Sequence, residues 1–128
     1  MVGADRTKTV LRMALVRGLG LRSANALIRD FKRPEAVLAA PRNELEARIP
    51  PEVVDDLISP KSRERAETEW NKAEQLGIRI LDILDPHYPP LLREIFDPPV
   101  ILYIRGKRWN PAQPQMAIVG TRRPTATA

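Results

Sequence analysis

A glycine, two threonines and an arginine follow an apolar stretch near the C-terminal end of the chain. Gly120 comes directly after the Met-Ala-Ile-Val run at residues 116–119, and Thr121, Arg122 and Thr125 follow it. Many doubly wound α/β domains begin their first phosphate-binding turn where a strand ends at a glycine, because glycine lets the backbone approach an anion closely. The threonines offer hydroxyl groups, and arginine can bind a phosphate through two parallel hydrogen bonds. The segment therefore predicts a phosphate site, and the alternative is a buried edge strand with a charged turn.

A second anion site is predicted at residues 15–27, which have the form of a helix-hairpin-helix. Gly18 and Gly20 flank a leucine in the turn, and glycine permits the positive φ angles that tight turns need. Free N–H groups at the start of the second helix can hold a phosphate oxygen, and Arg17, Arg22 and Arg29 add attraction that salt screens. The alternative is a turn that serves only packing, with the leucine filling the core.

Residue types that carry catalysis or bind metals are sparse in this chain. It has no cysteine and a single histidine, His87, so disulfides, thiolate sites and histidine clusters are excluded. Asp85 and Asp97 lie beside prolines with no serine or cysteine nucleophile, which is ordinary turn chemistry. The turn at Gly120 lacks the three-glycine dinucleotide fingerprint. We therefore expect no catalytic residues, no metal and no cofactor.

Composition and charge indicate a globular protein with two basic ends. The chain has 128 residues, 43% of them apolar and 29% charged, with no apolar run long enough to span a membrane and no signal-peptide core. We expect a cytoplasmic location. The net charge is +6 over residues 1–33, −6 over residues 34–104 and +5 over residues 105–128. This asymmetry favours contact between the ends and a polyanion, although solvated helix faces would give the same pattern.

Apolar spacing predicts helices in the first part of the chain and strands in the second. Residues 7–16 and a segment from Ser23 to Phe31 have helical periodicity, and shorter helical segments follow. Ser59 and Pro60 suit the start of a longer helix that Gly77 ends.

After Gly77, strands are predicted at residues 78–83, 100–104 and 117–119, with a helical turn at 91–96 between the first two. This order predicts a helical domain over residues 1–75 and the beginning of an incomplete α/β domain over residues 76–128.

Aromatic side chains are few, and each could stack on a nucleic-acid base. Trp70 and Tyr103 fall at core-like positions, where packing is the better interpretation, and Trp109 lies in a basic polar loop. The remaining aromatic candidates are Tyr88 and Phe96.

The order of these pieces resembles the DNA-processing family called DprA or Smf. The matching motifs are the Gly-Leu-Gly turn at 18–20, a helix ending in Phe31, Tyr-Pro-Pro-Leu-Leu at 88–92, Asp-Pro-Pro-Val-Ile-Leu-Tyr at 97–103 with Gly106 after it, and Ala-Ile-Val-Gly-Thr-Arg with a later threonine at 117–125. The resemblance implies an α plus truncated α/β fold. A small SAM-like or helix-hairpin-helix bundle is followed by the first strands of a Rossmann-like sheet, and we expect the rest of that sheet beyond residue 128.

The same resemblance implies that the protein is not an enzyme. Family members bind single-stranded DNA through the Rossmann-like domain and help to load the RecA recombinase during natural transformation, the DNA recombination of competent cells. Arg122 is similar to the family arginine that contacts DNA phosphate, Gly120 and Thr121 to the turn that presents it, and Thr125 to the next threonine of the motif. We expect a homodimeric parent protein and weak DNA binding by residues 1–128 without the rest of the domain.

Two other functions fit the same residues. A Rossmann-like nucleotide hydrolase of the phosphoribohydrolase type begins with a similar turn, and it would carry a glutamate-rich motif downstream. A helical protein-interaction module that does not touch DNA is the other alternative, and neutralising Arg17 and Arg22 would separate it from a DNA-binding protein.

Overall fold

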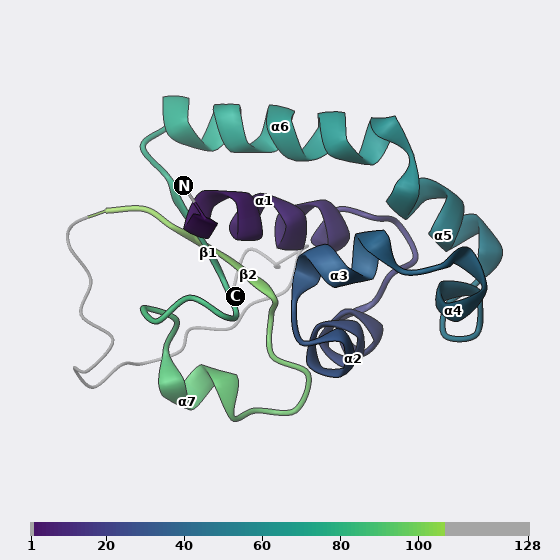
Figure 1. Ribbon diagram of the computed structural model, residues 1–128. Helices are drawn as coiled ribbons and strands as arrows, with labels where there is room; N and C mark the ends of the chain where they lie inside the picture. The colour runs from purple at the N-terminus through teal and green to yellow at the C-terminus, as the bar shows by residue number, and fades with distance from the viewer. Residues whose placement is uncertain (1, 107–128) are drawn as a thin grey trace, which may run out of the picture.

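The computed structural model describes residues 2–106, in which helices precede a small sheet (Figure 1). The confirmed fold class is therefore α plus a truncated α/β part, while the strand expected at residues 117–119 lies outside the described residues. The elements in chain order are α1 (Val2–Ala14), α2 (Leu21–Phe31), α3 (Pro34–Ala39), α4 (Arg42–Glu46), α5 (Pro51–Ile58), α6 (Pro60–Gln75), β1 (Arg79–Asp82), α7 (Pro90–Arg93) and β2 (Ile101–Ile104).

Helix α1 is the central element of the fold. It lies between α6 on one side and α2 and α3 on the other, and it also contacts both strands (Figure 1). Its apolar side chains consequently point in two directions. Val10 and Met13 enter the larger core cluster, whereas Leu11 packs with Ala66 and Ala73 of α6 in a smaller one. This two-sided burial explains why the apolar residues of α1 do not form a single narrow stripe.

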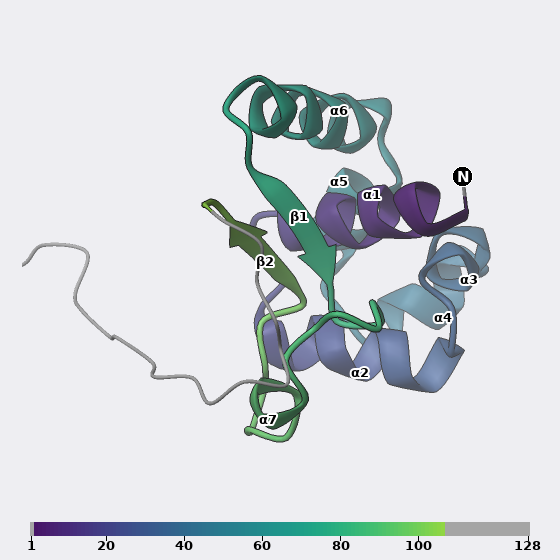
Figure 2. The same cartoon turned by 90° about the vertical axis from the view of Figure 1, so that its left-hand side faces the viewer.

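The two strands form an antiparallel ribbon that packs beside α1 (Figure 2). Arg79 pairs with Ile104 at one end and Asp82 with Ile101 at the other. Just beyond the ribbon, the Ile83 N–H donates to the Val100 carbonyl at 2.9 Å, and both side chains belong to the larger core cluster. The core is thus continuous across residue 75, and the division into domains at 1–75 and 76–128 stays a prediction.

Local signals located the helix ends correctly where a cap or a glycine marks them. The Ser59 hydroxyl accepts from the Ser62 N–H at 3.3 Å, and Pro60 is the first helical residue of α6. Gly77, with φ of 69°, follows the end of this helix. The helix predicted at residues 7–16 instead begins at Val2 and ends at Ala14. Its first turns lack strong apolar periodicity and are held by a distant contact described below.

Candidate nucleic-acid interface

The turn between α1 and α2 has a geometry that only glycine suits at its centre. Gly18 has φ of 92°, and a Cβ atom there would lie 3.1 Å from Val53 Cγ2 of α5. Leu19, buried next to it, donates its N–H to the Val16 carbonyl at 3.2 Å. Both Gly18 and Leu19 therefore take part in packing, as the alternative interpretation of this turn predicts.

Substituting Gly18 with alanine is expected to lower the free energy of unfolding by about 1–3 kcal/mol, because the new side chain meets both a left-handed backbone and Val53. The matched control is Gly20→Ala, whose backbone has φ of −75° and whose added Cβ would meet nothing within 4 Å. Urea denaturation of both variants measures the difference, and equal stability of the two would contradict the assigned role of Gly18.

Gly20 lies at the N-cap of α2, and no side chain among residues 2–106 caps this helix. The first backbone N–H groups of an α-helix have no carbonyl partner within the helix, and they carry the positive end of the helix dipole. The Ala24 N–H makes the first helical bond, to the Gly20 carbonyl at 3.0 Å. The start of α2 is therefore open to an anionic ligand.

Arg17 and Arg22 lie on either side of this open helix start, and both are exposed. Neither guanidinium forms an ion pair or a hydrogen bond with a residue that the structure describes. Arg17, Gly18, Gly20 and Arg22 thus occupy one short basic turn. The other predicted site residues, Gly120, Thr121, Arg122 and Thr125, lie outside the described residues, and their role stays a prediction.

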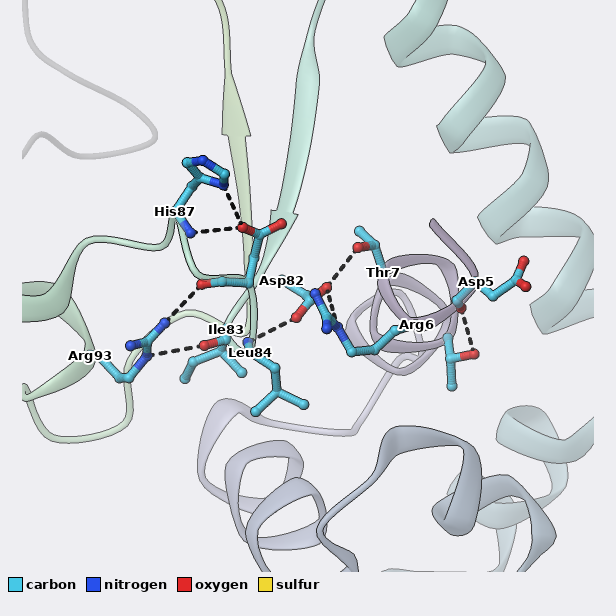
Figure 3. A network of polar contacts seen from close by, with 10 residues as sticks. Asp5, Arg6, Thr7, Asp82, Ile83, Leu84, His87 and Arg93 are labelled. Carbon is cyan, nitrogen blue, oxygen red and sulfur yellow. Dashed lines mark hydrogen bonds and ion pairs between the residues drawn. The ribbon is translucent and has the colours of Figure 1, made fainter. Parts of the chain in front are cut away.

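A buried carboxylate joins α1 to the end of β1 (Figure 3). Asp82 is fully buried and accepts hydrogen bonds from Arg6 Nε at 3.1 Å, from the Thr7 hydroxyl at 2.6 Å and from the Leu84 N–H at 2.8 Å. Buried charges are tolerated where a partner and hydrogen bonds compensate them. This network holds the N-terminal turns of α1 and so explains why that helix begins earlier than its periodicity predicts.

The aspartate and histidine of the β1–α7 connection make a turn, as predicted. The Asp85 carboxylate accepts from the His87 N–H at 2.8 Å and lies 3.1 Å from His87 Nδ1. Arg93 donates from Nε to the Ile83 carbonyl at 3.1 Å and from Nη2 to the Asp85 carbonyl at 3.0 Å (Figure 3). These contacts hold the segment between β1 and α7 in a defined conformation.

The exposure of the aromatic side chains differs from what their spacing predicts. Tyr88 is fully buried, which excludes base stacking, and burial raises the pKa of its hydroxyl. Tyr103, predicted as core, is 50% exposed because β2 is the outer strand, while Phe96 is 85% exposed. Trp70 is partly buried as predicted, and its Nε1 donates to Glu74. Trp109 lies outside the described residues.

Sequence reasoning does not identify three residues of this region. The buried Asp82 is missed because its partners on α1 are distant in sequence. The exposed Lys32 and Arg93 are also missed, although Arg22 and Asn25 lie at helical spacing on α2 and Lys32 directly follows that helix.

Within residues 2–106, no group of His, Asp or Glu side chains is arranged to hold a metal ion. The same part of the chain contains no helix that is long and apolar enough to cross a membrane.

The fold and this surface define a mostly helical protein with an attached β-ribbon and an exposed basic turn. Residues 79–128 match the family described as DNA recombination-mediator protein A. The resemblance to the DNA-processing family is thereby confirmed over this range, which begins at the first residue of β1 and contains the Tyr-Pro-Pro, Asp-Pro-Pro and Val-Gly-Thr-Arg segments. The match points to a role in DNA recombination or processing. No curated protein and no solved structure matches the chain.

Proposed function

We propose that this protein binds single-stranded DNA and assists a RecA-type recombinase in DNA recombination, including that of natural transformation. The match of residues 79–128 to a recombination mediator supports the role. The structural observation that carries DNA contact is the open N-terminus of α2 between two exposed guanidinium groups, those of Arg17 and Arg22.

The chemistry of the turn suits a phosphate backbone. The backbone N–H groups at the start of α2 donate to a phosphate oxygen, and the helix dipole favours its negative charge. Arg17 and Arg22 neutralise the neighbouring phosphates and release their counterions. None of these contacts reads a base, so binding here is independent of sequence. A recombination mediator needs this property, because it must act on strands of any sequence.

The turn is proposed as an auxiliary site beside a principal phosphate site at Gly120, Thr121, Arg122 and Thr125. The two sites would belong to the helical part over residues 1–75 and to the Rossmann-like part over residues 76–128. We further propose that the protein acts as a homodimer.

Neutralising the turn is expected to weaken DNA binding. For Arg17→Gln/Arg22→Gln, we expect about a tenfold loss of affinity for a fluorescein-labelled oligothymidine at low salt, because two phosphate contacts disappear. The slope of log affinity against log salt should fall by about 1.4, or about 0.7 for each contact. Fluorescence anisotropy titrations over a range of salt concentrations measure both quantities.

The matched control is Lys72→Gln/Arg79→Gln, which removes the same charge from two exposed residues at the end of α6 and the start of β1. Its affinity should stay within about twofold of the wild type. Equal losses in both double variants would reject the turn as a specific contact. Absence of DNA binding by the unmodified chain would reject the proposed function and favour the protein-interaction module.

A further inference from the structure

An open groove of about 650 Å³ lies between α2 and the connection from β1 to α7. Its cationic lining consists of Arg29 and Lys32 from the α2 side and Arg93 from the opposite side, and none of the described residues that line it is acidic. The volume falls within the range of about 300–1,000 Å³ that is typical of small-ligand sites. A small anionic group in the groove would therefore have cationic side chains on two of its sides.

Arg93 is held in place before any ligand arrives. Two backbone carbonyl groups, those of Ile83 and Asp85, accept hydrogen bonds from its guanidinium (Figure 3). The guanidinium also lies 5.2 Å from the centre of the Tyr88 ring. A guanidinium has five N–H donors, so others stay available for a phosphate. Because the side chain is already ordered, binding an anion here loses little conformational entropy.

The groove continues a basic stripe that begins at the turn. Arg22, Asn25 and Arg29 follow one another at intervals of three and four residues, which places them along one side of α2, and Lys32 is the C-cap residue that follows the helix. The step from Arg22 to Arg29 extends about 10 Å along the helix. The Asn25 side-chain amide donates to the Pro98 carbonyl at 2.9 Å, so this side of the helix faces the α7 region.

The acidic residue of α2 lies on a different side of the helix. Asp30 accepts a hydrogen bond from Arg48 at 2.6 Å, and this bond holds the pKa of the Asp30 carboxyl below its ordinary value. Arg29 also lies near Asp30, at 3.5 Å, but its side chain is 74% exposed, so solvent screens this contact. The stripe consequently keeps its positive charge.

The remaining lining of the groove is apolar. Ile28 and Ile83 are buried at its base, while Leu84 is 40% exposed and Pro86 is exposed beside it. An apolar floor with cations around it fits the two parts of a nucleotide, since the base has an apolar face and the phosphate is an anion.

We propose that this groove holds one nucleotide of a DNA single strand that runs along α2 from the turn at Gly20. Arg29, Lys32 and Arg93 contact its phosphates, and the base packs against Leu84 and Pro86. This inference rests on the proposed function and deepens it, because a base can enter the groove only when it is unpaired. Duplex DNA keeps its bases stacked inside the helix. The groove would therefore give the helical part of the protein a preference for single strands.

The phosphate part of the inference is tested with Arg29→Gln/Lys32→Gln in the full chain. Affinity for an oligothymidine of about 12 nucleotides should fall about tenfold at low salt, with a salt slope smaller by about 1.4. Lys72→Gln/Arg79→Gln is again the control of equal charge.

The base part is tested with two probes of equal length, the oligothymidine and a strand of abasic phosphate units. The unmodified protein should bind the oligothymidine about fivefold more tightly, because base contacts with a protein surface add to the phosphate term. Leu84→Ser should reduce this preference to less than twofold while leaving affinity for the abasic strand unchanged. Since Leu84 is partly exposed, the variant should still fold, and its circular dichroism spectrum verifies this.

The outcomes separate the groove from the proposed function. If Arg17→Gln/Arg22→Gln weakens binding while Arg29→Gln/Lys32→Gln behaves like the control, the groove is rejected and the function stands. Equal affinity of the unmodified protein for the two probes would overturn the base site. If the unmodified chain binds neither probe, the proposed function fails and the groove proposal fails with it.

Discussion

Replacing Asp82 with alanine is expected to destabilise the protein by about 3–5 kcal/mol, the range for breaking a buried ion pair by removing one partner. The Asp82 carboxylate is fully buried, and it accepts from Arg6, from Thr7 and from the Leu84 N–H. Without it, Arg6 and the Leu84 N–H lose their acceptor, and α1 loses its attachment to β1. Urea denaturation at neutral pH, followed by circular dichroism, measures the change.

Two further substitutions define the source of the Asp82 effect. Asp82→Asn retains an oxygen that can accept from the Leu84 N–H, so it should destabilise the protein less than alanine does. Glu64→Ala removes an exposed carboxylate of α6 and should change stability by less than about 0.5 kcal/mol. A loss below about 1 kcal/mol for Asp82→Ala would show that the network does not hold α1.

Tyr88→Ala should be about as destabilising, at about 3–5 kcal/mol, because it empties a large volume in the core. Tyr88 is fully buried: its side chain belongs to the larger core cluster, and its hydroxyl donates to the Pro99 carbonyl at 2.6 Å. The loss should appear as a lower midpoint of urea denaturation.

Tyr88→Phe isolates the contribution of the hydroxyl group. Burial raises the pKa of this phenol, so it stays protonated at neutral pH and remains a donor. Removing it leaves the Pro99 carbonyl without this partner and should cost about 1 kcal/mol. If alanine were no more harmful than phenylalanine, the packing role assigned to the ring would be wrong.

The elements that sequence predicted well are those with local signals. Ser59 and Pro60 mark the start of α6, and Gly77 marks its end. Short apolar segments located both strands of the ribbon to within one residue at each end. Each of these signals depends on near neighbours in the chain, which is why periodicity and cap chemistry sufficed.

The features that sequence did not predict depend on distant contacts. The early start of α1 requires the bond between Arg6 and Asp82, and the burial of Tyr88 requires the core that the helices form. For the candidate interface, glycine spacing located the turn at Gly18, but its contact with Val53 could not be inferred. Likewise, the stripe on α2 was readable in the sequence, whereas Arg93 joins it only through the fold.

The shared core of the helices and the ribbon has a consequence for synthesis of the chain. Ile83, Tyr88 and Val100 complete the cluster that also contains Val10 and Met13 of α1. A nascent polypeptide that has emerged only as far as α6 still lacks these three side chains. The larger core cluster is therefore incomplete until Val100 has emerged from the ribosome, and the apolar surface that these side chains cover stays exposed during that interval.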